Sequence, residues 1–315
     1  MPSQQTNHPL PAGFQLDRYR IERQLSLGGF SIVYLAHDED GTPVAIKEYL
    51  PNALALRREG QVAPAIDEAC QSAFRQGMRC FFEEGRALAH LNHPNVVRVL
   101  NFFRANETVY MVMQYERGRT LQEHIQKYKG EIRENFVRGV FTRLLNGLRE
   151  VHTQKLLHLD IKPSNIYLRT DGTPVLLDFG AARQALDTSG PVLKPMYTPG
   201  FAAPEQYKGL DQLGPWTDIY AVGASMYACL NGSAPQAADK RVEKDQVQLA
   251  AKRWEGKYSP QLLEIIDWCM VLNHVDRPMS VFALQKAVAE RHHKAGAPSS
   301  WLNNLSKSLK GLIKT

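Results

Sequence analysis

The sequence predicts an α+β fold with two lobes, a strand-rich first lobe and a helical second lobe. Between residues 19 and 115, polar and apolar residues alternate in short runs, which is typical of strands. After Thr120 the apolar residues recur three and four positions apart, which indicates amphipathic helices. Strands and helices occupy separate stretches, and this favours α+β over a doubly wound parallel sheet. With 315 residues, 43% of them hydrophobic, the chain can bury a sizeable core as one large domain or two lobes.

The first lobe is expected to contain several strands and one helix. YRIERQL and SIVYLA alternate polar and apolar residues, and TPVAIKEYL follows the turn signal Asp40-Gly41. Residues 68–92 carry helical spacing, after which NVVRVLNFF and TVYMVMQY return to strand character. Residues 1–13 are polar and contain prolines, so a disordered lead-in is expected before the first strand.

The second lobe is expected to be mostly helical. LQEHIQKY and FVRGVFTRLLNGLREVHTQ are predicted helices, and two short strands, NIYL and PVLLD, flank the turn Asp171-Gly172. A loop rich in Gly and Pro follows at 186–204, with helices continuing to about residue 291. The apolar stretch 219–230 is too short to span a bilayer, so a buried helix is expected there.

Composition narrows the class of protein. The net charge of +6 lies partly in the C-terminal lysines Lys307, Lys310 and Lys314, so a nucleic-acid surface is not expected. The four cysteines are scattered without a C-x-x-C pair, which favours reduced thiols in a cytoplasmic protein over a disulfide framework or a zinc site. The N-terminus lacks the charged and apolar regions of a signal peptide.

Two stretches in the first lobe could bind phosphate. In LSLGGFSIVYLA the small residues Gly28 and Gly29 would let backbone N–H groups approach phosphate oxygens, although two such glycines are more often just a turn. In VAIK, Lys47 lies in an apolar strand, where its burial requires an anionic partner. Glu84 on the predicted helix or a ligand phosphate could be that partner. The alternative is an edge-strand lysine pointing to water.

Two further stretches carry groups for metal-assisted phosphate chemistry. HLDIKPSN places Asp160, Lys162 and Asn165 within a few residues, and LLDFG places Asp178 directly after an apolar strand. Asn and Asp oxygens are ligands of the kind that hold Mg²⁺ to nucleotide phosphates. A second Asp can accept a proton from an attacking hydroxyl, and a nearby Lys can balance phosphate charge.

In this order, and with AAPE at 202–205, these motifs resemble the signature of the eukaryotic-type serine/threonine protein kinases, and VAIKEYLPN and HLDIKPSN resemble the bacterial branch. The resemblance covers about residues 15–291. It implies a bilobal kinase fold, with a small antiparallel-sheet N-lobe that carries one helix and a larger helical C-lobe. The implied domain spans 14–291, divided into an N-lobe at about 14–116 and a C-lobe at about 117–291.

The resemblance also implies the site residues. Asp160 would be the catalytic base, Lys162 would neutralise the transferring phosphate, and Thr198 would belong to the same site. Asn165 and Asp178 would hold Mg²⁺, or alternatively Mn²⁺. Lys47 would contact the α- and β-phosphates of ATP and pair with Glu84, with Glu83 the less favoured partner. The remaining ATP-binding residues would be Leu27, Gly28 and Gly29 over the phosphates, Val33 and Ala45 around adenine, Met113 as gatekeeper, and Gln114, Tyr115 and Glu116 in the hinge.

Three departures from the family pattern stand out. Ser26 and Ser31 replace two glycines of the phosphate loop, and Leu159 replaces the arginine that normally receives an activation-loop phosphate. Lys194 occupies the usual phosphosite, so activity is predicted not to require phosphorylation there. The segment between Lys47 and Glu84 is longer than usual. It could regulate the helix that carries Glu84, but a passive surface loop is expected.

The predicted function is a serine/threonine protein kinase that uses Mg-ATP and acts on protein substrates and on itself. The alternative is a pseudokinase that binds ATP as a scaffold, which the departures favour and the intact Asp160, Asn165 and Asp178 oppose. A small-molecule phosphotransferase is disfavoured by Thr198 and AAPE. Residues 292–315 are expected to form a linker and a basic amphipathic helix, which could dock on the kinase, on a partner or on a membrane surface.

Overall fold

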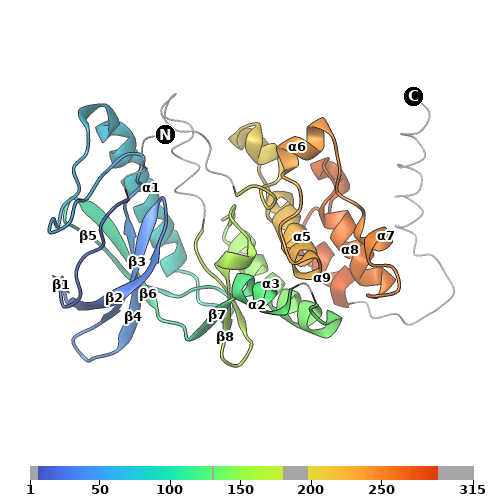
Figure 1. Ribbon diagram of the computed structural model, residues 1–315, viewed down its shortest axis with the longest axis horizontal. Helices are drawn as coiled ribbons and strands as arrows, with labels where there is room; N and C mark the ends of the chain where they lie inside the picture. Colours follow the sequence, from blue (N-terminus) through green and yellow to red (C-terminus); the bar gives the residue numbers. More distant parts are fainter. Residues whose placement is uncertain (1–5, 130, 180–197, 290–315) are drawn as a thin grey trace.

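The computed structural model of the protein describes residues 6–129, 131–179 and 198–289. Within these ranges a sheet with one long helix and a helical bundle form two lobes (Figure 1). The predicted α+β class is therefore confirmed. In the described residues no helix combines the length and apolarity needed to cross a bilayer. The predicted C-terminal helix and most of the predicted loop at 186–204 lie outside the described residues.

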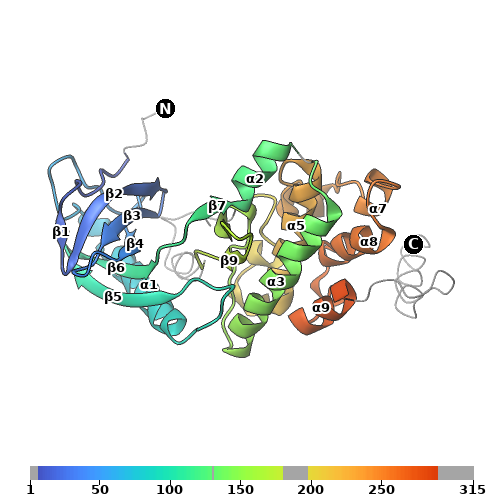
Figure 2. The ribbon, with the colours of Figure 1, turned by 90° about the horizontal axis from the view of Figure 1, so that it is seen from below.

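The N-terminal lobe is built on one antiparallel sheet with the strand order β1-β2-β3-β4-β6-β5. Its strands are β1 Gln15–Leu16, β2 Tyr19–Leu27, β3 Ser31–His37, β4 Pro43–Tyr49, β5 Val99–Ala105 and β6 Thr108–Gln114. The helix α1, Gln71–Ala89, follows a short 3₁₀ turn at Glu68–Cys70 and packs against β5 and β6 (Figure 2). Its apolar face supplies the buried residues Phe74, Met78, Phe81 and Leu88.

Side chains alternate between the two faces of this sheet. In β4, Lys47 points to the opposite face from Ile46 and Glu48, because successive side chains on a strand point to opposite sides. Residues directly opposite Ile46 and Glu48 on the neighbouring strands share their face, as the pairings Tyr34–Ile46 and Glu48–Tyr110 show. We call this side the outer face. All four side chains are fully buried, so something must cover them.

The cover comes in part from the N-terminal residues. Asn7 is 2% exposed and donates from Nδ2 to the Leu50 and Ala55 carbonyls at 3.2 and 3.1 Å. Leu10 is buried, and its N–H donates to the Tyr34 hydroxyl at 3.1 Å. The expected disorder of residues 1–13 is therefore wrong for residues 6–13, because tertiary contacts replace the local pattern that this polar stretch lacks. Residues 1–5 lie outside the described part.

The rest of the cover comes from the long segment between β4 and α1. Arg57 in this segment is fully buried and forms a two-armed ion pair with Glu48, at 2.6 Å from Nη1 to Oε1 and 2.8 Å from Nη2 to Oε2. Its Nε donates to the His8 carbonyl at 2.8 Å, which ties the segment to the N-terminal residues. The expectation of a mere surface loop is wrong, because this segment closes the outer face of the sheet. The expectation that it does not regulate α1 stays a prediction.

The C-terminal lobe is helical, as predicted. Its helices are α2 Leu121–Tyr128, α3 Glu134–Thr153, α5 Pro215–Asn231, α6 Ala238–Glu243, α7 Ala250–Arg253, α8 Pro260–Cys269 and α9 Val281–Ala289. Helix α5 is buried on all sides from Thr217 to Leu230, which confirms the predicted buried helix. Glu205 and Arg277 form a buried ion pair in this lobe, with two contacts of 2.8 and 3.0 Å.

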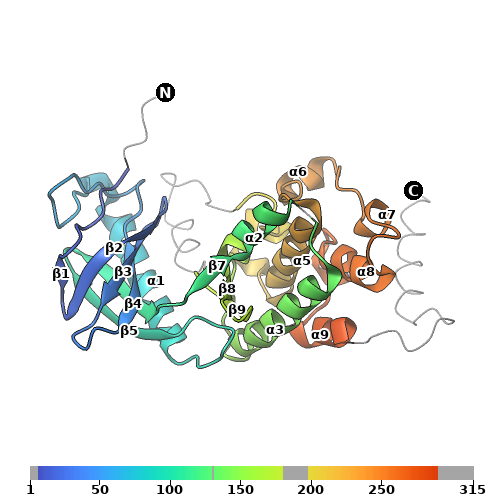
Figure 3. The same ribbon diagram turned by 60° about the horizontal axis from the view of Figure 1, so that its bottom comes forward.

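A small sheet joins the lobes. It contains β7 Gly118–Thr120, β8 Ile166–Arg169 and β9 Pro174–Leu176, in the order β7-β8-β9 (Figure 3). From the N-terminal lobe, the loop before β5 reaches this sheet, because Val97 N–H donates to the Leu176 carbonyl at 3.0 Å and Leu176 N–H donates to the Asn95 carbonyl at 2.9 Å. The end of β9 leads directly to Asp178, so both lobes contribute to the position of that residue.

Candidate active site

A pocket with a volume of about 330 Å³ lies between the two lobes. Six predicted nucleotide-binding residues line it, namely Val33, Ala45, Met113, Gln114, Tyr115 and Glu116. The sequence analysis missed other lining residues, among them Leu25, Val97, Tyr167 and Leu177. Tyr167 and Leu177 lie in the short strand runs NIYL and PVLLD. Their apolar character predicts burial, but it does not show that both side chains face the pocket. The pocket is mainly apolar with a few polar groups, as small-molecule sites usually are.

The glycine-containing turn lies between β2 and β3. Gly28 N–H donates to the Ser31 carbonyl at 2.9 Å, which closes the hairpin tightly. Phe30 is buried beneath the turn, with its ring 5.2 Å from that of Tyr49. The residues Leu27, Gly28 and Gly29 stand in this turn and are not among the residues that line the pocket. Their contact with phosphate stays a prediction, whereas Ser26 does line the pocket.

Lys47 brings a buried cation to the inner face of the sheet. Its Nζ lies 3.0 Å from Asp178 Oδ1 and 5.6 Å from the ring centroid of Phe81 on α1. Glu84 follows Phe81 by about one helical turn and is also buried, so both occupy the face of α1 that packs on the sheet. Lys47 thus forms an ion pair with Asp178, and its pairing with Glu84 stays a prediction.

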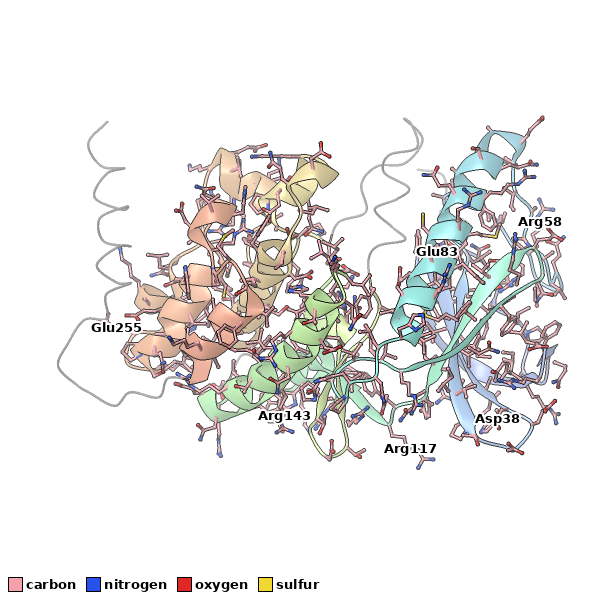
Figure 4. All side chains as sticks on the ribbon, turned by 180° about the vertical axis from the view of Figure 1, so that it is seen from behind. Asp38, Arg58, Glu83, Arg117, Arg143 and Glu255 are labelled. Carbon is pink, nitrogen blue, oxygen red and sulfur yellow. The ribbon has the colours of Figure 1, made fainter. Side chains whose placement is uncertain are left out.

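Glu83 does not share the position of Glu84. Its side chain is 59% exposed and lies 3.7 Å from Arg86 on the solvent side of α1 (Figure 4). Neighbouring helical positions point about 100° apart, so Glu83 and Glu84 face different directions. Glu83 is therefore excluded as the partner of Lys47.

Asp160, Lys162, Thr198 and Asn165 form one hydrogen-bonded cluster. Lys162 Nζ lies 3.1 and 2.9 Å from the two Asp160 carboxylate oxygens and donates to Thr198 Oγ1 at 2.8 Å. Thr198 Oγ1 in turn donates to Asp160 Oδ1 at 2.9 Å. Asn165 Nδ2 donates to Asp160 Oδ2 at 2.9 Å, which leaves its Oδ1 as the atom that could bind a cation. The structure thus brings together four residues that the sequence analysis assigned to the site.

Asp218 on α5 holds the backbone of this loop. Its carboxylate accepts from His158 N–H at 2.9 Å and from Leu159 N–H at 2.7 Å, and His152 Nε2 lies 2.8 Å away. Burial alone would raise the pKa of Asp218, but the hydrogen bond from His152 and the nearby histidines keep it below its usual value. Asp218 therefore stays charged and holds the loop through its two backbone hydrogen bonds.

His158 occupies the centre of the loop as a neutral imidazole. It is fully buried, and burial lowers its pKa. Its Nε2 lies 2.8 Å from the Leu177 carbonyl, so Nε2 carries the proton, and Nδ1 accepts from Asp160 N–H at 3.3 Å. The centroids of the His158 and Phe179 rings lie 4.4 Å apart. His158 thereby links the Asp160 loop to the Asp178 segment.

Leu159 adopts the left-handed backbone region, with φ at 62°, a conformation that is uncommon outside glycine. Two hydrogen bonds hold it there. Its N–H donates to Asp218 Oδ1 at 2.7 Å, and its carbonyl accepts from Gln206 Nε2 at 3.0 Å. The sequence analysis missed Gln206, which directly follows AAPE. The position that carries an arginine in the family is thus fixed here by contacts to its backbone.

Asp178 stands where the pocket meets the cluster. It lines the pocket and pairs with Lys47, and its carbonyl lies 3.4 Å from Asn165 Nδ2. Its φ of 47° turns the chain sharply after β9 and aims the carboxylate into the site. Asn165 and Asp178 are neighbours, as a shared cation would require.

Comparisons with known proteins agree with the resemblance found in the sequence motifs. A family model described as the protein kinase domain matches residues 19–289. Serine/threonine-protein kinase B of Synechocystis sp. is 32% identical over 235 residues, which are 70% of this chain and 38% of that protein. Serine/threonine-protein kinase PknA of Nostoc sp. is 29% identical over 263 residues, which are 80% and 43% of the two chains. This chain therefore spans less than half the length of either relative.

Solved structures with the same fold include bacterial kinase domains. A structure titled PpkA-294 apo form has a TM-score of 0.81 and 35% identity, and the match covers 89% of this chain and 99% of that one. The PknI kinase domain of Mycobacterium tuberculosis has a TM-score of 0.66 at 22% identity and covers 90% of this chain and 99% of that one, which supports the fold alone.

Proposed function

This chain belongs to the protein kinase family, and on that premise we propose that it transfers the γ-phosphate of ATP to serine and threonine hydroxyls of proteins. The single observation that carries the proposal is the cluster of Asp160, Lys162, Thr198 and Asn165 next to Asp178 at the end of the pocket. A scaffold that only binds nucleotide has no use for this proton acceptor and cation pair. The relatives' names, serine/threonine-protein kinases, support the choice of acceptor.

The pocket fits the adenosine part of ATP. Its apolar walls at Val33, Ala45 and Leu177 suit a flat aromatic base, and the hinge segment 114–116 runs along one side with its backbone polar groups. Lys47 reaches Asp178 at the end of the pocket, where it would bind the phosphates. The volume of about 330 Å³ lies at the lower end of the range for small-molecule sites.

Asn165 and Asp178 would hold Mg²⁺ together with phosphate oxygens. Both offer hard oxygen atoms and lie side by side, and magnesium in proteins usually binds one or two such groups plus substrate phosphates. When bound, the ion neutralises charge on the phosphates and orients them. Mn²⁺ prefers similar ligands and is proposed as a substitute.

Asp160 and Lys162 would act on the two partners of the reaction. Asp160 orients the acceptor hydroxyl and receives its proton, while the hydroxyl oxygen forms its bond to the γ-phosphorus and the bond to the β–γ bridging oxygen breaks. Lys162, held by Asp160 and Thr198, compensates negative charge on the phosphoryl group in transit. Thr198 fixes the carboxylate orientation through its donated hydrogen bond.

We also propose that activity does not depend on a phosphate at the usual activation-loop site. Leu159 cannot pair with a phosphate, and its backbone is already held by Asp218 and Gln206. Lys194 at the usual site cannot be phosphorylated on oxygen. The variants Thr188→Ala and Ser189→Ala, made one at a time, should therefore keep their activity. Loss of transfer by either variant in a folded protein would reject this part of the proposal.

The remaining parts of the proposal concern place and partners. All four cysteines are free thiols, which suits the reducing cytoplasm. The proposed acceptors are unknown proteins and the kinase itself, by autophosphorylation. The C-terminal segment 292–315 is proposed to contact the kinase, a partner or a membrane surface, and no nucleic-acid partner is expected.

Transfer of labelled γ-phosphate from Mg-ATP to the protein and to a generic basic substrate tests the function. The wild-type chain should form phosphoserine or phosphothreonine, and Asp160→Asn should lower the rate by about a hundredfold or more. Asp171→Asn makes the same exchange in the exposed turn between β8 and β9 and should leave the rate unchanged. Nucleotide binding without any transfer in the wild type would reject the kinase and indicate a pseudokinase.

A further inference from the structure

A carboxylate of the pocket wall at the hinge belongs to an ion pair. Glu116, one of the pocket-lining residues, accepts from Arg169 Nε at 2.7 Å and from Arg169 Nη2 at 2.6 Å. The two side chains are 11% and 25% exposed, respectively, so the pair is largely shielded from water. The hydrogen bonds to Glu116 raise the pKa of Arg169 further, so the arginine is permanently charged.

The backbone sets the position of both partners. Gly118 in β7 pairs directly with Arg169 in β8, and Thr170 N–H donates to the Arg117 carbonyl at 3.1 Å. A Cβ on Gly118 would collide with the Leu168 carbonyl, so the hinge runs unusually close to β8. The third contact of Arg169, from Nη1 to the Pro94 carbonyl at 2.9 Å, fixes the guanidinium from the other side. Arg169 is therefore held beside Glu116 by two segments, the hinge at 116–118 and the loop at Pro94.

The other charges around the pocket show why the charge balance at Glu116 matters for nucleotide binding. Three carboxylates line the pocket, those of Glu116, Glu123 and Asp178. Asp178 is paired with Lys47, and Glu123 accepts from Thr120 N–H at 2.6 Å at the N-terminus of α2, where a negative charge is favourable. Glu116 is the carboxylate in the hinge itself, and Arg169 supplies its positive counterpart. ATP carries several negative charges, so an unpaired carboxylate in this wall would oppose its binding.

We propose that Arg169 is a positioning residue for nucleotide binding, which neutralises the Glu116 carboxylate so that the pocket accepts a polyanionic nucleotide. This inference rests on the proposed function, because it takes ATP as the ligand of the pocket. Arg169 acts through Glu116 and is not among the residues that line the pocket. If this is right, losing Arg169 weakens the binding of charged nucleotides selectively. A change in hinge geometry would instead weaken charged and uncharged ligands alike.

The test compares ATP with adenosine, two ligands with the same base and sugar but different charge. Dissociation constants are measured by calorimetry for the full chain and for Arg169→Gln. The variant should bind ATP about five- to tenfold more weakly, since one uncompensated charge near a site typically changes an affinity by roughly one pKa unit or less. Its affinity for adenosine should change by less than about twofold, and high salt should reduce the loss for ATP.

A double variant separates charge from structure. Glu116→Gln/Arg169→Gln removes both charges and should recover most of the ATP affinity that Arg169→Gln loses. Arg138→Gln is the matched control, because Arg138 forms a similar 2.6 Å pair with Glu134 on α3, and neither residue lines the pocket. This control should alter the melting temperature without changing the ratio of ATP to adenosine affinity.

Two results would overturn the inference. One is an equal loss of ATP and adenosine affinity in Arg169→Gln that the double variant does not restore, which would make Arg169 a structural clamp. The other is unchanged binding of both ligands. A wild-type chain that binds neither ligand would instead reject the ATP pocket of the proposed function, so the two failures are distinguishable.

Discussion

Thr198 shows how a single hydroxyl can organise the candidate site. It donates to Asp160 and accepts from Lys162, so one oxygen bridges the proposed base and the proposed phosphate-neutralising cation. Without this hydroxyl, Asp160 and Lys162 would still form their ion pair. Each would lose the hydrogen bond to Thr198 that fixes the orientation of its side chain. Orientation of this kind is a large part of catalysis in phosphoryl transfer.

Thr198→Val should therefore lower kcat by about tenfold to a hundredfold, because it removes the hydroxyl while keeping the side-chain shape. The dissociation constant of ATP should stay unchanged, since Thr198 is not among the pocket-lining residues. Thr198→Ser, which retains the hydroxyl, is the control and should keep most of the activity. Equal rates for the valine and serine variants would show that the hydroxyl plays no part.

His158 makes stability depend on pH. Its pKa is lowered by burial from the ordinary 6.5, so below that pH the unfolded chain binds a proton that the folded chain refuses. The stabilisation is fully present above pH 6.5 and is lost as the pH falls towards the folded-state pKa. The free energy of unfolding should drop by up to about 1.4 kcal/mol per pH unit in this window from His158 alone.

His158→Gln isolates this contribution, because glutamine can still donate to the Leu177 carbonyl but does not titrate. Urea unfolding between pH 7.5 and 5 should show a shallower acid loss in the variant than in the wild type. His93 and His124 also have lowered pKa values and act in the same direction in both proteins, so the difference between the two curves reports His158. Parallel curves would contradict the assignment.

At the scale of elements, strand β4 serves two purposes at once. Its inner side presents Lys47 to the site, and its outer side presents Glu48 to Arg57 of the long segment before α1. Tyr34 and Tyr110 also donate to Glu48, at 2.7 and 2.8 Å, and burial raises the pKa of both hydroxyls so that they stay protonated. The segment that leads into α1 is thus fastened directly behind Lys47.

Arg57→Met should destabilise the protein by about 3–5 kcal/mol, because it leaves the buried Glu48 charge without its cation. Glu48→Gln/Arg57→Met should cost less than Arg57→Met alone, since no lone charge remains. Arg58→Met, at the neighbouring exposed position labelled in Figure 4, is the control and should cost little. Denaturant unfolding measures all three, and similar values for Arg57→Met and Arg58→Met would contradict the importance of the buried pair.

At the scale of the whole molecule, the lobes meet where the loop at Asn95 lies between α3 and β9. Asn95 Nδ2 donates to the Pro174 carbonyl at 2.7 Å, and Gly147 of α3 leaves no room for a side chain, since a Cβ there would lie 2.8 Å from the Asn95 carbonyl oxygen. The next residues after β9 are Leu177 and Asp178. The close packing at Gly147 therefore affects the position of Asp178, a proposed metal ligand.

Gly147→Ala should push the Asn95 loop away from α3, disturb its contacts with β9, and lower kcat/KM for ATP by about tenfold, with a reduced melting temperature. Gly139→Ala makes the same exchange in the same helix, where no atom lies within 4 Å of the new Cβ. It should stabilise the helix by about 0.5–1 kcal/mol and leave kinetics unchanged. An active, stable Gly147→Ala protein would show that the two lobes tolerate displacement at this joint.

The sequence was sufficient to predict the fold class, the order of the elements and the cluster around Asp160. Strand and helix periods are local signals, and HLDIKPSN and LLDFG are compact motifs. Contacts between distant positions carried no such signal. Glu116 and Arg169, and likewise Asn7 and Leu50, are far apart in the chain and are joined only by the tertiary fold. The polar stretch 6–13 was expected to be disordered because its partners could not be recognised.

The cover of the outer face has a practical consequence for handling the protein. The family match begins at residue 19, so a chain trimmed to that boundary would lack Asn7, Leu10 and Leu16. The buried residues Ile32, Tyr34, Ile46 and Tyr110 of the outer face would then lose part of their cover and be more exposed to neighbouring molecules. Such a preparation would suffer first in solubility and shelf life, even though every group proposed for phosphoryl transfer is still present.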